Sequence, residues 1–198
     1  MRKMTKTGRL IALVAAILWA AIPAAAKDAK SQITDLDAIP RVKPHYPIPS
    51  EPNQVFYIER SSNSNTVVYC AGLDKDGKLD KSEPIKAYWR WYNVDGHVKT
   101  LNFAERMMAY GIKSVKHDGP NGSYSFKIAA MPERTLYIGL DAKGQPEVFS
   151  KVGERWVKLA YVYLEVDDHG LMPDVPELDF FGLDRTTGKA IREHINRR

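Results

Sequence analysis

The segment RWVKLAYVYLEV, residues 155–166, decides the fold of this chain. Apolar side chains occupy both of its alternating faces, whereas a half-buried strand alternates apolar with polar residues. A run that is apolar on both faces is typical of a strand with neighbours on both sides and cover on both faces. The segment therefore predicts a central, buried strand around which the rest of the domain is arranged.

Shorter segments before and after it repeat the same period of two. They are rich in aromatic and β-branched residues, which pack well on a pleated, half-buried surface. The SSNSN stretch at 61–65 is typical of a turn, because Ser and Asn side chains bond the local backbone. We expect strands at QVFYIER (54–60), TVVYC (66–70), IKAYWRWY (85–92), SYSFKIAA (123–130), RTLYIGL (134–140), PEVFSKV (146–152), ELDFFGL (177–183) and KAIREHI (189–195), the last two joined as a hairpin.

One helix interrupts the strands, over about residues 102–110. Asn102 can cap its first turn, and Glu105, three residues later, completes a capping box. Its apolar residues recur at helical spacing, which is typical of a face turned towards the core. On this interpretation Met107 and Met108 fill the core.

These elements define the fold class. Many short strands, regular turns and one short helix indicate a mainly β protein, an antiparallel β-sandwich or barrel. The sequence divides into a targeting segment at 1–26, a proline-rich extended leader at 27–52 and a single β-rich domain at 53–198. The order of the strands does not follow from the sequence.

The first 26 residues read as a cleavable signal peptide. A basic start and an apolar run precede small residues at the cleavage position, which predicts cleavage after Ala26. No later stretch approaches the roughly 20 apolar residues that a membrane helix needs. We expect export without a membrane span in the mature chain, to the periplasm or the outside medium, a choice that the signal leaves open.

The basic charge of the chain belongs largely to this signal. Four basic residues and no acid lie in the first 26 residues, so a formal net charge of +5 falls to +1 after cleavage. A nucleic-acid-binding domain needs a basic patch or stripe of its own, and nucleic acid is therefore not an expected partner.

The leader, residues 27–52, contains IPRVKPHYPIPSEP, whose prolines favour an extended, polyproline-like chain and exclude a regular helix. It can serve as a tether or as an arm laid over the domain. Cys70 is the only cysteine, so the chain forms no internal disulfide and depends on core packing. At the end of a strand-like run, Cys70 is expected to be a buried, inert thiol.

A possible metal loop occurs at AGLDKDGKLDKSEP, residues 71–84. With Gly77 at position 6 of a calcium loop, acidic residues fall at positions 3, 5, 9 and 12. Gly72, however, stands where the first carboxylate belongs, and Pro84 prevents the exit into a helix that the last ligand normally occupies. We interpret the loop as an acidic turn and keep as weak metal candidates Asp74, Asp76, Asp80 and Glu83.

Two other clusters suggest chemistry. Asp167, Asp168, His169 and Asp174 carry ligand types that suit divalent ions, but their spacing fits no known pattern and their loop follows a strand. His117 lies in HDGPNGS, which consists almost entirely of residues that are common in turns. No catalytic elbow, zinc pair, P-loop or dinucleotide fingerprint occurs. No cofactor is therefore expected, and an enzyme would have to use one of these two loops.

The strongest binding candidate is the outer face of AYWRWY, residues 87–92. Tyr88, Arg90 and Tyr92 alternate with the tryptophans, so that two aromatic rings flank a guanidinium. An exposed stripe of this kind can stack on a sugar or hold an anionic group. If another sheet or the leader covers the stripe, the same residues belong to the core and its edge and have only a structural role.

Three segments carry a resemblance to a known family: FYIERSSNSNTVVY (56–69), AYWRWY (87–92) and ERMMAYGI (105–112). They resemble a family of exported bacterial proteins, domain of unknown function 4833, over most of the chain after Pro52. The resemblance implies a secreted or periplasmic, mainly β domain and supplies no reaction or catalytic residue. The polar members of these segments include Arg60, Asn63, Asn65 and Arg106.

From the sequence we expect a non-enzymatic binding or scaffolding module of the cell envelope. Its partner would be an envelope component or a glycan, bound through Tyr88, Arg90 and Tyr92, with Arg60, Asn63 and Asn65 nearby. The alternative is an envelope hydrolase or metal-dependent enzyme that uses the loop of Asp167, Asp168 and His169.

Overall fold

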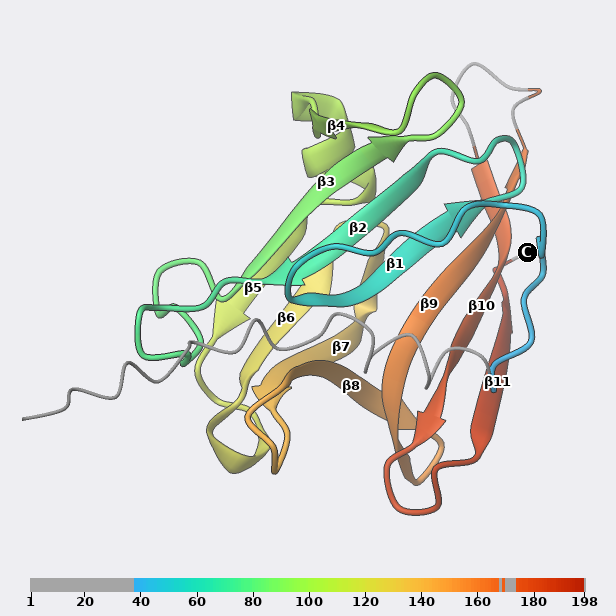
Figure 1. Cartoon of the computed structure of the whole chain (residues 1–198). Coiled ribbons are helices and arrows are strands. Elements are labelled where there is room, and N and C mark those ends of the chain that lie inside the picture. Colours follow the sequence, from blue (N-terminus) through green and yellow to red (C-terminus); the bar gives the residue numbers. More distant parts are fainter. Residues whose placement is uncertain (1–37, 168, 170–173, 198) are drawn as a thin grey trace, which may run out of the picture.

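The computed structural model describes residues 38–167, 169 and 174–197, which form one curled sheet with the shape of a half-barrel (Figure 1). The strands are β1 (Gln54–Arg60), β2 (Thr66–Ala71), β3 (Ile85–Trp91), β4 (His97–Thr100), β5 (Ile112–Lys116), β6 (Tyr124–Ile128), β7 (Met131–Leu140), β8 (Pro146–Val152), β9 (Arg155–Asp167), β10 (Asp174–Asp184) and β11 (Ala190–Asn196). Two short helical turns, η1 (Glu105–Ala109) and η2 (Pro120–Gly122), complete the described elements. The predicted mainly β fold is confirmed.

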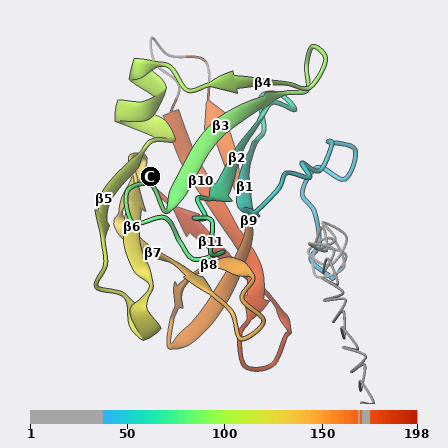
Figure 2. The same cartoon turned by 60° about the vertical axis from the view of Figure 1, so that its left-hand side comes forward.

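The predicted central strand is also confirmed, because β9 lies at the junction of the sheet. The order runs β4-β3-β2-β1-β9-β8-β7-β6-β5, while β10 pairs with the other edge of β9 and β11 pairs with β10. Along one edge of β9, residues 155–158 pair with β8 and residues 161–164 pair with β1. The sheet therefore divides at this edge into two wings, which curl towards each other (Figure 2).

One strand pair differs from the antiparallel expectation. β1 runs parallel to β9, with Tyr57 opposite Tyr161 and Arg60 opposite Leu164. Antiparallel direction is imposed on neighbours that a tight hairpin joins, whereas β1 and β9 are separated by most of the domain. Their direction is set by packing, which local sequence patterns do not record.

The main core lies between the two wings. Phe56 and Tyr69 stack there with ring centroids 4.2 Å apart, and the Tyr69 hydroxyl donates to the Tyr110 carbonyl at 2.7 Å. Cys70 is buried as predicted, and burial raises the pKa of its thiol to about 11. A thiol with this pKa stays protonated at neutral pH and is a poor nucleophile.

A second cluster forms on the outer face of the sheet, under residues 38–52, which we call the strap. Ile39 of the strap is buried against the rings of Tyr57, Tyr161 and Phe181. These rings stack in sequence, with centroid distances of 5.4 Å and 4.4 Å. The Tyr161 hydroxyl donates to the Pro40 carbonyl at 2.8 Å and so holds the strap to β9.

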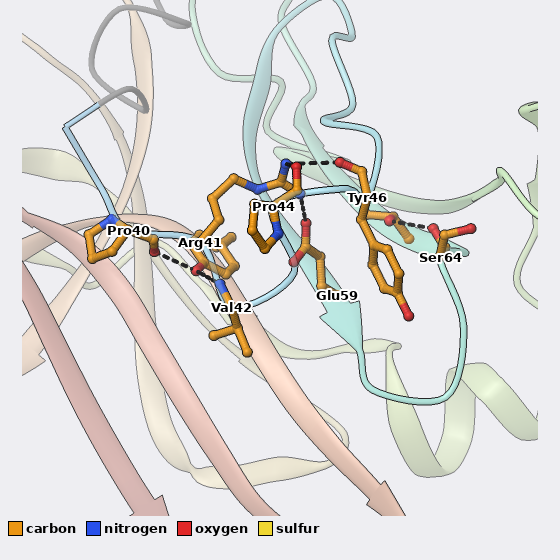
Figure 3. A network of polar contacts seen from close by, with 9 residues as sticks. Pro40, Arg41, Val42, Pro44, Tyr46, Glu59 and Ser64 are labelled. Carbon is orange, nitrogen blue, oxygen red and sulfur yellow. Dashed lines mark hydrogen bonds and ion pairs between the residues drawn. The ribbon is translucent and has the colours of Figure 1, made fainter.

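An ion pair fixes the middle of the strap (Figure 3). Arg41 donates from one nitrogen to the carboxylate of Glu59 and from another to the Tyr46 carbonyl, at 2.8 Å for the latter. Glu59 is fully buried, and burial raises its pKa, although Arg41 acts in the opposite direction. The second carboxylate oxygen, Oε2, is buried without a hydrogen-bond partner among the described residues. The strap is therefore the cover that makes Glu59 an interior residue.

The helix is present, and its predicted capping box is confirmed. The Asn102 amide donates to Glu105 Oε2 at 2.7 Å, and the Glu105 amide donates to Asn102 Oδ1 at 2.9 Å. The interpretation of Met107 and Met108 as core residues is wrong, because both are about half exposed and no residue of η1 is buried. The turn leans away from the sheet, and the buried residues that anchor it lie outside η1 on either side.

The described part of the chain contains no helix that is long and apolar enough to cross a membrane. The predicted signal peptide, its cleavage after Ala26 and the leader up to residue 37 lie outside the described residues. Export therefore stays a prediction.

Candidate binding cleft

A cleft opens where β7 and β8 separate. Their backbone pairing runs from Leu140 opposite Pro146 to Tyr137 opposite Phe149. Beyond that point side chains join the strands, because the Ser150 hydroxyl donates to the Thr135 carbonyl at 2.9 Å. Between this part of β7 and the hairpin β10–β11 lies a cleft of about 800 Å³.

The floor of the cleft is apolar. Met131 of β7 and Leu178 and Phe180 of β10 line it, and all three are buried members of the main core. Ile195 of β11 packs against the same core and also lines the cleft. The cleft therefore reaches down to the core between the strands.

Arg134 bridges the two walls. It donates from one nitrogen to the Lys151 carbonyl of β8 at 2.6 Å and from another to Glu193 Oε2 of β11 at 2.7 Å. Its guanidinium also lies 4.6 Å from the centroid of the Phe180 ring. Because three contacts hold one side chain, Arg134 presents a fixed set of donors and a fixed planar surface at the cleft.

Aromatic rings form one wall. Tyr137 stacks on Phe149, and Trp156 meets both rings edge to face with centroid distances of 5.5 Å. Trp156 is half-buried, and Lys151 Nζ lies 5.6 Å from its ring centroid. A tryptophan held by two other rings keeps its orientation without a ligand and so offers a prepared stacking surface.

Charges of both signs surround this wall. Lys151 and Arg197 line the cleft together with the acids Asp118 and Glu133. Arg197 approaches Glu133 at 3.7 Å, and both side chains retain solvent contact. Such exposed pairs are weak and exchange readily for other hydrogen-bonding partners. The cleft thus combines a stacking ring, an apolar floor and several hydrogen-bonding groups.

The predicted binding stripe on β3 lies in a different place, on the opposite wing. Arg90 donates to both carboxylate oxygens of Glu51, at 2.5 and 2.7 Å, and to the Gly96 carbonyl at 2.8 Å. The Tyr88 hydroxyl lies 3.3 Å from the Cys70 sulfur, and Tyr92 is half-buried. The end of the strap therefore contacts the stripe, as one of the two interpretations anticipated, and binding there stays a prediction.

The polar residues after β1 are occupied by their own turn. Arg60 donates to Asn63 Oδ1 at 2.7 Å and lies 4.8 Å from the centroid of the Trp89 ring. Asn65 Oδ1 accepts from the Asn93 amide at 2.9 Å and so ties this turn to the β3–β4 turn. The contacts of Arg60, Asn63 and Asn65 account for the turn and bring none of them to the cleft.

In the acidic loop, carboxylates bond the loop itself. Asp74 accepts from the Asp76 and Lys78 amides, both at 2.9 Å. Hydrogen bonds from Ser82 hold the pKa of Asp80 below its ordinary value. Glu83 lies 3.1 Å from Lys86. In the ranges 38–167 and 174–197, with residue 169, no group of three or more His, Cys, Asp or Glu is placed to hold a metal ion.

The two histidine loops also have local partners. His117 Nε2 lies 2.9 Å from the Gly122 carbonyl oxygen, and Asp118 accepts from the Ser125 hydroxyl. His169 Nδ1 lies 2.8 Å from Asp167 Oδ1, and the His169 side chain is 97% exposed. Asp168 is outside the described residues. Asp118 lines the cleft, so the turn that contains His117 approaches it.

Sequence reasoning missed the residues that form the cleft. Arg134 and Trp156 each stand on a predicted strand, where alternation indicates only that they face away from their apolar neighbours. What brings them together is the separation of β8 from β7, and no signal in a single sequence marks that separation.

A family model described as "Domain of unknown function (DUF4833)" matches residues 56–194. The matched range covers both wings of the sheet and all the described residues that line the cleft except Ile195 and Arg197. The chain matches no curated protein and no solved structure.

Proposed function

Because the chain belongs to the family described as a domain of unknown function (DUF4833), whose description assigns no activity, we propose its function from the cleft. The protein is a non-enzymatic binding module of the cell envelope that holds a segment of glycan between β7, β8 and the β10–β11 hairpin. The proposal moves the binding site from the β3 stripe to the opposite wing.

The observation that supports this most is the position of Trp156 in the same cleft as Arg134. Sugars present patches of C–H groups that lie on aromatic rings and hydroxyls that need fixed hydrogen-bond partners. Trp156 offers the ring, and Arg134, Lys151 and Glu133 offer donors and an acceptor. A cleft of about 800 Å³ also falls within the roughly 300–1,000 Å³ typical of small-molecule sites.

Export is the second part of the proposal. It rests on the basic start, the apolar run and the small residues before Lys27. N-terminal sequencing of the protein recovered from the envelope fraction should begin at Lys27. If sequencing found Met1 instead, the cleavage part of the proposal would fail, whereas the argument for the cleft would stand.

Isothermal calorimetry on the purified protein tests the cleft. The probes are soluble glycan strands released from peptidoglycan and core oligosaccharides released from lipopolysaccharide. We expect saturable binding of one of them and a loss of about tenfold or more in affinity for Trp156→Ala, since a removed aromatic anchor commonly costs more than 1 kcal/mol.

Tyr92→Ala is the matched control, because it removes a half-buried aromatic ring from the stripe on the other wing. Its affinity should equal that of the wild type. Loss of binding in Tyr92→Ala with full binding in Trp156→Ala would return the site to the β3 stripe. Absence of binding to either glycan would reject the glycan as ligand.

A further inference from the structure

The helical turn η1 is held out from the sheet by buried residues at its two ends. Leu101 precedes it and Tyr110 follows it, and both belong to the main core. Tyr110 meets Trp89 edge to face at 5.0 Å, and its carbonyl accepts the Tyr69 hydroxyl. The residues between these anchors therefore cannot turn inwards, and they form a projection at one end of the half-barrel (Figure 2).

The projection carries large apolar side chains in solvent. Phe103 is 77% exposed, Met107 is 50% exposed and Met108 is 58% exposed, and we call these three residues the apolar tip. Phe103 and Met107 are four residues apart, a spacing that places them on the same side of a helical turn. Single exposed apolar residues are ordinary, but large ones gathered in one place mark an interaction surface.

The exposure of the tip is built into the chain. The Tyr110 amide donates to the Glu105 carbonyl, five residues back, at 2.8 Å, so the turn is wide. The capping box closes its start. Gly111 closes its end, because a Cβ on Gly111 would lie 1.8 Å from the Arg106 carbonyl oxygen. A π-type turn of this kind is uncommon and often occurs at functional sites.

Basic side chains surround the apolar tip. Lys113 Nζ lies 3.2 Å from the sulfur of Met107, and Arg106 is exposed within the turn. Among the residues that the structure describes, neither of these two cations forms an ion pair with a carboxylate. The acid in the same turn, Glu105, is engaged by the Asn102 amide in the capping box. The charge beside the tip is therefore positive.

We propose that the apolar tip is a membrane-docking surface, which inserts Phe103, Met107 and Met108 into the interface of an anionic bilayer. Arg106 and Lys113 would lie at the level of the lipid headgroups. Apolar residues flanked by cations are the composition of segments that lie in a membrane interface, where burial and attraction to anionic lipid act together. This inference does not depend on the glycan proposal.

A second copy of the chain is a poorer occupant of the same surface. Two apolar tips in contact would bring the cations of one copy close to the cations of the other, and like charges at an interface are unfavourable. An anionic lipid surface, in contrast, neutralises them. Three inserted side chains make a small contact, so docking should be reversible and weakened by salt.

Vesicle sedimentation with the purified protein tests the proposal. The two vesicle types are phosphatidylcholine alone and phosphatidylcholine with phosphatidylglycerol at about one in three. We expect the wild type to pellet with the anionic vesicles. The partition coefficient of Phe103→Ser/Met107→Ser should fall by roughly tenfold or more, since two large apolar side chains no longer leave water on docking. Lys113→Glu should show a smaller reduction.

Val94→Ser is the matched control. Val94 is 67% exposed but stands in the β3–β4 turn, at the far end of β4 from η1 (Figure 2). It should pellet like the wild type. Phe103, Met107 and Val94 are exposed and Lys113 is half-buried, and thermal melts check that each variant remains folded.

Three results would overturn the proposal. The first is failure of the wild type to pellet with anionic vesicles at low salt, and the second is equal pelleting of the wild type and Phe103→Ser/Met107→Ser. The third is a concentration-dependent dimer in light scattering that the same double substitution abolishes, because the second copy would then be the true occupant of the tip.

Discussion

The outer face of the sheet and the cleft each contain an arginine bonded to a glutamate, and they use the pair differently. Arg41 comes from the strap and reaches Glu59, which is fully buried. Arg134 crosses the cleft and reaches Glu193, whose side chain is 25% exposed. The first pair holds the strap over the outer face of the sheet, whereas the second joins the walls of a cleft that is open to solvent.

The difference lies in what each carboxylate can do without its arginine. Water reaches Glu193, which can exchange its partner for solvent. Glu59 has no such access, and an unpaired charge in the interior is costly. The strap can therefore cover the outer face of the sheet only if Arg41 pairs with Glu59. The groups of the cleft pair, in contrast, remain accessible to a ligand.

Removal of the two arginines should give the largest contrast. Arg41→Ala leaves Glu59 buried without its partner, so we expect a loss of about 3 kcal/mol in the free energy of unfolding. Arg134→Ala should cost about 1 kcal/mol, because Glu193 gains water in its place. Urea denaturation at neutral pH measures both.

The double substitution Arg41→Ala/Glu59→Gln is the control for this contrast. It removes the buried charge together with its partner and should recover a large part of the loss. If Arg41→Ala cost no more than Arg134→Ala, the strap would not depend on its ion pair, and the distinction between the two regions would disappear.

The pH dependence of stability sharpens the same contrast. Burial raises the pKa of Glu59 above the ordinary value of 4.5, so the folded state holds this proton more tightly than the unfolded state does. The stabilisation is complete below the ordinary pKa and is lost as pH rises through the raised pKa. The free energy of unfolding of the wild type relative to Glu59→Gln should therefore fall with increasing pH.

Urea denaturation of both proteins between about pH 4 and pH 8 follows this difference. A wild type that gained stability over Glu59→Gln with rising pH would mean that Arg41 outweighs the burial of the carboxylate.

Local patterns in the sequence predicted the elements and left their long-range contacts open. Residues 155–166 are apolar on both faces because β9 has neighbours on both edges, and that property is visible in the segment itself. The capping box of Asn102 and Glu105 is equally local. Such features depend on residues close in sequence, which is why they could be predicted.

The burial of Glu59, the exposure of the apolar tip and the cleft all depend on contacts between residues that are distant in sequence. Glu59 has the alternation of an ordinary solvent-facing position in QVFYIER, and only the strap, from another part of the chain, makes it an interior residue. Met107 and Met108 have the spacing of core residues, yet the anchoring of η1 at its two ends turns them outwards. The cleft likewise exists because two strands separate, which their alternation does not encode.

The smallest expected effect concerns the end of the strap, where Glu51 bonds Arg90. Cys70 lies beneath this region, in contact with Tyr88, and burial raises the pKa of its thiol to about 11. A thiol reagent should therefore label the native protein slowly at about pH 8, because almost no thiolate is present. Glu51→Ala should loosen the strap end and speed labelling severalfold, at a cost of about 1 kcal/mol or less in stability.

Glu193→Ala is the matched substitution, because it removes a similar arginine partner from the cleft. It should leave the labelling rate of Cys70 unchanged, since the Arg134–Glu193 pair does not hold the strap. Equal acceleration by both substitutions would show that labelling reports global opening of the domain. Acceleration by Glu51→Ala alone would show that the strap opens locally, and that the outer face is closed by a segment which can lift while the sheet beneath it stays folded.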